Sequence, residues 1–164
     1  MQIEYYWKQA TSYKSGRTSK VESIILHSTD GRSAAGDIET LTEGPVSVHW
    51  YVERSGKVHH FVANSDTAYH VGIVNDPAYS NAASVGIEQQ HIDGQQDWPD
   101  TQVKAVAMIV AKLRQDYGQL PVKSHAEVAK PAGRKVDPQN YPWDKFSLFV
   151  KEYSIAYSQI NEVA

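Results

Sequence analysis

The stretch VESIILH at residues 21–27 is the first segment of the chain whose composition clearly predicts one structure. Its β-branched residues favour a strand, and the turn-like sequence STDGRS at residues 28–33 ends that strand directly after His27. A second strand is predicted at Ser84–His91 (SVGIEQQH). There Val85 and Ile87 face one side of the sheet, whereas Glu88 shares the other side with small residues.

Between these two strands in the sequence, the pattern of apolar and polar residues predicts a β-hairpin. Val46–Glu53 alternates between apolar and polar residues, so Val46, Val48, Trp50 and Val52 should share one face. A turn at Ser55–Gly56 leads into a second strand at Lys57–Ala63. Asn64–Ala83 follows as an extended loop, and such loops often bind ligands.

Three helices and one further strand complete the prediction. A short helix is expected at Ala35–Glu43, and a longer one at Asp100–Tyr117, capped by Asp100 or Thr101 and ended by Gly118. The apolar stripe of the longer helix comprises Val103, Val106, Ala107, Val110, Leu113 and Tyr117. Leu120–Ser124 is a short strand, and the loop AEVAKPAGRKVDPQN follows His125. A final helix at Trp143–Ile160 should bury Phe146, Phe149, Val150, Tyr153, Tyr157 and Ile160. The chain is therefore predicted to be an α/β protein, one domain with a mixed β-sheet flanked by helices.

Composition narrows the function classes. The chain has 164 residues, of which 41% are hydrophobic and 21% charged, as in globular proteins. It contains no cysteine, which excludes disulfides, thiolate metal sites and thiol nucleophiles. Its net charge of −3 gives no basic surface for nucleic acid. No signal peptide or membrane-spanning run is visible, so we expect synthesis in the cytoplasm and no membrane partner.

Without thiolates, a transition-metal site must use imidazole and carboxylate groups. His27 ends one strand and His125 follows another, and strand ends bring distant residues together in α/β sheets. Asp137 lies on the loop that His125 opens, so it is the best candidate for a third ligand. Two histidines and one aspartate leave a fourth tetrahedral position for water, as in catalytic zinc sites. Buried His–Asp pairs also occur for structural reasons, so spacing alone does not establish a metal.

Two charged residues are candidates for chemistry beside such a metal. Glu88 has room for substrate or water next to it, although a strand glutamate is more often exposed and paired with a lysine. Lys135 lies two residues before Asp137, so both side chains would project the same way from an extended segment. Its ammonium group could stabilise an oxyanion, or it could be a solvated loop lysine. His59, His60 and His91 lack an acid partner and are expected on strand surfaces.

Several segments in order resemble the zinc-dependent N-acetylmuramoyl-L-alanine amidases of the type-2 amidase and peptidoglycan-recognition-protein family. They are IILHSTDG, VSVHWYVERSGKVHHFV, TAYHVG, SVGIEQQ, HAEVAKPAGRKVDP and YPWDKF, and the resemblance spans about residues 21–149. The resemblance implies one amidase domain over residues 1–164, with one zinc ion held by His27, His125 and Asp137. An aspartate as third ligand is similar to the bacterial and phage branch.

The resemblance also assigns the remaining site residues. It implies that Glu88 activates the attacking water and that Lys135 stabilises the reacting carbonyl. His70 corresponds to a histidine that lines the substrate cleft, and Tyr69 stands where the family usually has tryptophan. His49 is expected to touch substrate or to support a ligand, because it faces away from the apolar side of its strand.

The reaction implied by the resemblance is hydrolysis of the amide bond between N-acetylmuramic acid and L-alanine in peptidoglycan. Such an enzyme could be a phage endolysin or a bacterial autolysin, acting on the wall after release or as part of a larger secreted protein. The alternatives are a cytoplasmic amidase that recycles muropeptides, or a module that binds peptidoglycan without cutting it. The expected partner is peptidoglycan or a muropeptide, and the chain is expected to be a monomer.

Overall fold

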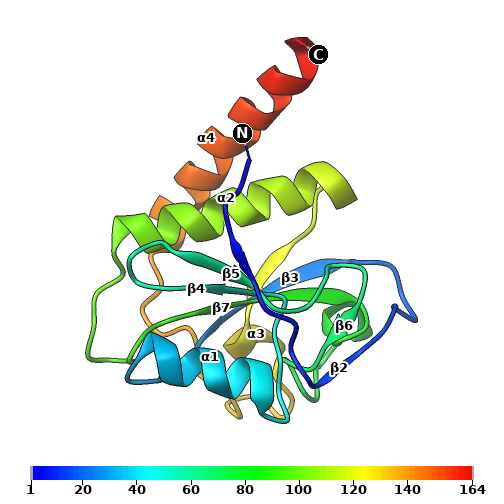
Figure 1. Ribbon diagram of the computed structural model, residues 1–164, viewed down its shortest axis with the longest axis vertical. Coiled ribbons are helices and arrows are strands. Elements are labelled where there is room, and N and C mark those ends of the chain that lie inside the picture. The colour runs from blue at the N-terminus through cyan, green and yellow to red at the C-terminus, as the bar shows by residue number, and fades with distance from the viewer. Residues whose placement is uncertain (1, 164) are drawn as a thin grey trace.

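The structure is a computed structural model, which describes residues 2–163. Its centre is a six-stranded sheet, flanked by helices on both faces (Figure 1). The strand order is β1 (Tyr6–Trp7), β5 (Val58–His60), β4 (Trp50–Val52), β7 (Ser84–Gln89), β3 (Ser23–Ser28) and β8 (Val122–Ser124). Only the β4–β5 hairpin is antiparallel, and the other neighbours run parallel. The predicted mixed α/β sheet is therefore confirmed.

The helices form two outer layers. Helices α2 (Asp100–Tyr117) and α4 (Trp143–Val163) lie on one face of the sheet, with α1 (Ala34–Glu43) and α3 (His125–Val128) on the other (Figure 1). A 3₁₀ turn at Pro77–Tyr79 and a small antiparallel pair, β2 (Tyr13–Lys14) with β6 (Thr67–Ala68), interrupt the loops. Among the described residues, no helix is both long and apolar enough to cross a membrane.

Side chains along the central strands alternate between the apolar core and the opposite face of the sheet. In β7, Val85 and Ile87 join the large apolar core beneath α2 and α4. The intervening residues Ser84, Gly86 and Glu88 therefore face the opposite side, where α1 and α3 lie. Parallel pairing places His27 of β3 directly beside Glu88 of β7. The sheet thus delivers two polar side chains to one end of the same face.

The predicted strand at Val46–Glu53 is wrong in its first half. Only Trp50–Val52 forms β4, and Val48 packs with Tyr51 and Phe61 in a second core instead of sharing a face with Trp50. The reason is a contact with a distant segment of the chain. The Ser47 N–H donates to the carbonyl of Tyr69, so residues before β4 are tied to a loop and leave the sheet.

The helix ends agree with prediction only in part. Helix α2 spans the predicted residues, but it begins after Pro99 with no side-chain cap, and Tyr117 is 41% exposed at its last turn. Helix α4 runs beyond Ile160, which is 48% exposed. Helix α3 was expected as loop, and a reciprocal capping box between Ser124 and Glu127 stabilises it.

Three histidines expected on strand surfaces are buried instead. His60 stacks on Trp50 and His91 stacks on Trp98, each with ring centroids 3.7 Å apart. His59 is hydrogen-bonded to Glu53. Aromatic neighbours thus bury these imidazoles, a contact that strand alternation alone does not reveal.

Gly118 ends α2 in a backbone conformation that only glycine adopts easily, with φ 91° and ψ −172°. We expect Gly118→Ala to lower the free energy of unfolding by about 1–3 kcal/mol. Open space surrounds the new methyl group, so strain is the cause rather than a clash. Urea unfolding, with exposed Gln119→Ala as the control, checks this value, and an unchanged midpoint would contradict it.

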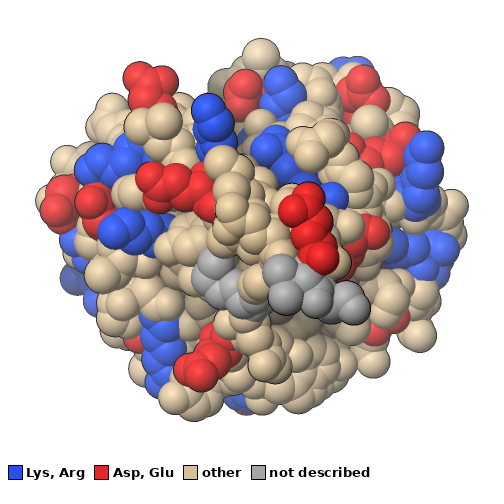
Figure 2. All heavy atoms as spheres, turned by 90° about the horizontal axis from the view of Figure 1, so that it is seen from above, with Lys and Arg blue, Asp and Glu red and all other residues tan. Residues whose placement is uncertain are grey.

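Charge on the surface is mixed. On the face shown in Figure 2, positive and negative side chains alternate, and no large patch of one sign forms.

Candidate metal centre and its cleft

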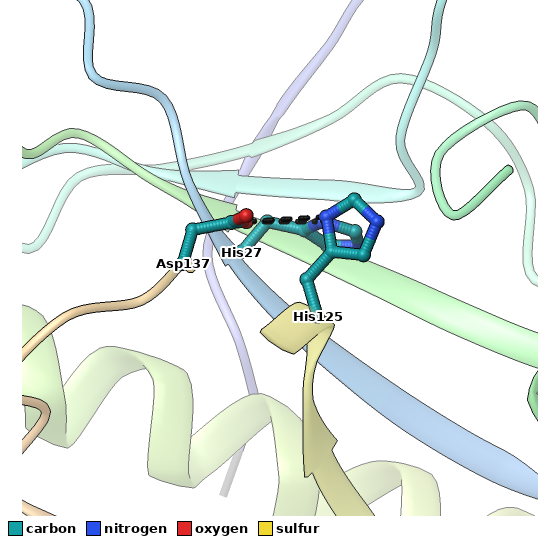
Figure 3. A group of neighbouring side chains, drawn as sticks. All are labelled: His27, His125 and Asp137. Carbon is teal, nitrogen blue, oxygen red and sulfur yellow. Dashed lines mark hydrogen bonds and ion pairs between the residues drawn. The ribbon is translucent and has the colours of Figure 1, made fainter. Parts of the chain in front are cut away.

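Three side chains from distant parts of the sequence converge at the end of the sheet. His27 lies in β3, His125 begins α3 directly after β8, and Asp137 lies on the following loop (Figure 3). The two Nδ1 atoms are 3.0 Å apart, and Asp137 Oδ2 lies 3.5 Å from that of His27 and 3.3 Å from that of His125. The structure therefore brings together the three residues that the sequence suggested as ligands.

These distances match the edges of a small coordination tetrahedron. Zinc bonds of about 2.0–2.1 Å at tetrahedral angles separate neighbouring donor atoms by about 3.3 Å. The protonation of His125 agrees with this geometry. Its Nε2 donates to the carbonyl oxygen of Val71 over 3.0 Å, so the neutral ring leaves Nδ1 unprotonated toward His27 and Asp137. The trio thus fits a cation that prefers nitrogen and oxygen donors.

Burial and close contacts set the protonation of His27 and Asp137. Desolvation lowers the pKa of His27, which favours the neutral imidazole that binds metals. Burial alone would raise the pKa of Asp137, but its close contacts with the rings of His125 and His27 outweigh this effect and hold that pKa well below its usual range. A neutral His27 imidazole and an ionised Asp137 carboxylate therefore face each other.

Glu88 faces the same space with an altered pKa. Burial raises the pKa of Glu88 well above its usual value, and the negative charges of Asp137 and Asp37 raise it further. Lys135 acts in the opposite direction and lowers it. A carboxyl group with a raised pKa in a cleft is suited to accept and return a proton near neutral pH.

A cleft of about 540 Å³ opens over these groups and extends along α1. Its walls include the trio, Glu88, Lys135 and His70, together with Ser28, Thr29, Gly31, Arg32, Ser33, Gly36, Asp37, Thr40, Leu41, Val46 and Ser47. Such a volume suits a ligand the size of a small molecule or short peptide. The α1 side of the cleft was not anticipated from the sequence, because no motif marks these residues.

Two residues assigned to substrate contact lie outside this lining. Tyr69 is 39% exposed and does not border the cleft. His49 is fully buried behind it, where Nδ1 accepts from the Gly86 N–H over 3.0 Å. Burial and the neighbouring Arg17 charge lower the pKa of His49 to about 3, so this ring stays neutral. His49 therefore supports the backbone of β7.

A buried carboxylate fixes α1 against the sheet, and sequence reasoning missed it. Asp37 accepts hydrogen bonds from Tyr51 Oη over 2.8 Å and from Thr29 Oγ1 over 2.9 Å. Gly31 makes this possible, because a Cβ there would lie 1.7 Å from Asp37 Oδ1. This cluster positions the cleft wall beside Glu88.

Comparisons with known proteins agree with this architecture. A family model described as N-acetylmuramoyl-L-alanine amidase (Amidase_2) matches residues 17–140. The solved structure of a selenomethionine AmpD derivative is 21% identical, with 92% of this chain and 96% of that chain covered and a TM-score of 0.80. No curated protein sequence matches the chain.

Two further solved structures share the fold. The N-acetylmuramyl-L-alanine amidase AmiD from E. coli is 23% identical with a TM-score of 0.70, and the match covers 79% of this chain but 57% of AmiD. The N-acetylmuramoyl-L-alanine amidase LysC from Clostridium intestinale is 15% identical with a TM-score of 0.69, and the match covers 92% of this chain and 99% of LysC.

Proposed function

Because the chain belongs to the N-acetylmuramoyl-L-alanine amidase family, we propose that His27, His125 and Asp137 hold one zinc ion per chain. The enzyme hydrolyses the amide bond between N-acetylmuramic acid and L-alanine in peptidoglycan. The observation that carries the metal assignment is the spacing of three donor atoms at 3.0–3.5 Å beside an open cleft. Two imidazoles and a carboxylate suit zinc better than magnesium or calcium, which prefer oxygen donors.

Glu88 is proposed as the general base and acid. When bound, zinc supplies Lewis-acid activation of water and of the scissile carbonyl. Glu88 lines the cleft next to His27, where its carboxylate can accept a proton from the attacking water. The protonated carboxyl then donates to the leaving nitrogen of L-alanine, so the proton passes from water to the product amine.

Lys135 is proposed to stabilise the oxyanion that forms when the carbonyl carbon becomes tetrahedral. It lines the same cleft, two residues before Asp137. Its fixed positive charge acts where negative charge develops, which is the most effective place for electrostatic catalysis. The same charge lowers the pKa of Glu88 and keeps more of that base ionised.

Lys135→Met is expected to change both the rate and its pH dependence. We expect kcat/KM to fall by about 10²–10³-fold, as for other lost oxyanion stabilisers. The acidic limb should also move to higher pH, because removing the cation raises the pKa of Glu88, whose ionised form is the base. A pH–rate profile checks this, with Lys145→Met as the control, since Lys145 pairs with Asp100. An acidic limb that stays in place would contradict the role.

The biological context is proposed from the relatives, which include an endolysin amidase from Clostridium intestinale that shares the fold with a TM-score of 0.70. We favour lysis of intact peptidoglycan, as for an endolysin or autolysin that reaches the wall after release, with residues 1–164 as one monomeric amidase domain. AmiD, a structural relative, was solved with the substrate anhydro-N-acetylmuramic acid-L-Ala-D-γ-Glu-L-Lys. That complex keeps muropeptide recycling as a second candidate.

Digestion of two substrates tests the proposal. Purified walls and soluble anhydro-muropeptides are incubated separately with the enzyme, and newly exposed L-alanine amino groups are counted. A lytic enzyme releases them from intact walls, whereas a recycling enzyme releases them from the soluble fragments alone. No release from either substrate would contradict the amidase function itself.

A further inference from the structure

His70 connects the metal trio to the interior of the protein through a continuous chain of contacts. Its Nδ1 lies 2.8 Å from His27 Nε2, and its Nε2 lies 3.1 Å from the hydroxyl oxygen of Ser84. That hydroxyl in turn lies 2.7 Å from the carbonyl oxygen of Ser80. The contacts thus run from His27 through the side chains of His70 and Ser84 to the backbone carbonyl of Ser80.

The Ser80 carbonyl fixes the direction of every hydrogen bond in this series of contacts. A carbonyl oxygen only accepts, so the Ser84 hydroxyl donates its proton to Ser80. The Ser84 oxygen therefore accepts from Nε2–H of His70, and neutral His70 has an unprotonated Nδ1. That nitrogen accepts from Nε2–H of His27. His27 consequently presents an unprotonated Nδ1 to His125 and Asp137.

The backbone around His70 is fixed as firmly as its ring. Asn81 Oδ1 accepts from the N–H groups of both His70 and Val71, each over 3.0 Å. The carbonyl of Val71 holds the other imidazole, His125. One dipeptide therefore orients both histidines of the trio.

The ring of His70 also requires a special feature of β7. A Cβ on Gly86 would lie 2.6 Å from Cγ and Nδ1 of His70, so only glycine leaves room for the ring against the strand. Three alternate residues of β7, which share one face of the sheet, thus have different roles. Ser84 anchors His70, Gly86 accommodates its ring, and Glu88 reaches the cleft.

We propose that His70 is a positioning residue, which fixes the tautomer and orientation of His27 for metal binding. This inference rests on the proposed zinc site and deepens it. It differs from the expected role of His70 in substrate contact, because its Nδ1 and Nε2 are both engaged by protein atoms. Hydrogen-bonded partners of metal ligands commonly raise metal affinity in this way.

The test measures zinc affinity by chelator competition, with no substrate present. We expect His70→Ala to weaken zinc binding by about 10–100-fold. His70→Asn should recover most of the affinity, since its side-chain oxygen can accept from His27 near the position of Nδ1. Ser84→Ala and Gly86→Ala should each weaken binding, because the first frees the His70 ring and the second displaces it. His59→Asn serves as the matched control, since His59 contacts Glu53 instead of the trio.

Two results would overturn the inference. One is wild-type zinc affinity in His70→Ala together with a raised KM for muropeptide, which would assign His70 to substrate contact. The other is wild-type zinc affinity in both Ser84→Ala and Gly86→Ala. This second result decides the question even if His70→Ala does not fold. A wild-type protein that binds no zinc would instead refute the proposed metal site and, with it, this role. The affinity assay therefore separates the two failures.

Discussion

Glu88→Gln is expected to lower kcat by about 10²–10⁴-fold while zinc remains bound. Glutamine keeps the size and polarity of the side chain but cannot take a proton from water. Glu88 is not one of the three clustered donor residues, so its loss should leave zinc affinity unchanged. Parallel measurements of turnover and zinc content check both halves of the prediction.

The pH profile adds a second criterion for Glu88. In the wild type, burial and the neighbouring carboxylates raise the pKa of Glu88, so activity should be lost on acidification well above the usual titration range of a glutamate. Glu88→Gln should lack this limb, because no carboxyl group remains to titrate. Glu53→Gln, which alters a glutamate paired with His59, is the control. Release of L-alanine termini by Glu88→Gln at the wild-type rate would refute the general-base role.

His125→Ala is expected to abolish stoichiometric zinc binding and to reduce hydrolysis to the background rate. His125 supplies one of three donor atoms, and its other nitrogen is anchored to the carbonyl of Val71. Two remaining donors hold a metal far less tightly than three. Metal analysis after dialysis, combined with an activity assay in added zinc, measures both effects.

The control variant for His125→Ala must remove a histidine that lies outside the metal trio. His59→Asn removes a buried histidine that belongs to the hairpin strand β5. It should retain one zinc per chain and near-normal turnover. A His125→Ala protein that keeps one tightly bound zinc would show that the metal lies elsewhere.

Much of the fold could be predicted because local patterns and global packing agree. The apolar stripe of α2 and the stop at Gly118 define its ends without tertiary information. The alternation in β7 likewise places Val85 and Ile87 in the core. By contrast, a backbone hydrogen bond between Ser47 and Tyr69 sets the path of the segment before β4, and no local sequence pattern predicts that bond.

The site was partly predictable for a similar reason. His27 and His125 stand at the ends of neighbouring parallel strands, so the sheet itself brings them close. Asp137 follows on the connecting loop. The contact of His70 with His27 was not predictable, because it depends on the path of a long loop and on the space above Gly86.

The central claim is that one zinc ion sits among His27, His125 and Asp137 with a single position left for solvent. A crystal structure of the zinc-loaded enzyme, with anomalous data collected at the zinc edge, tests it directly. We predict one peak bonded to both Nδ1 atoms and to the Asp137 carboxylate at about 2.0–2.2 Å, with water as the fourth ligand. A peak at another place, or a fourth protein side chain on the metal, would contradict the account.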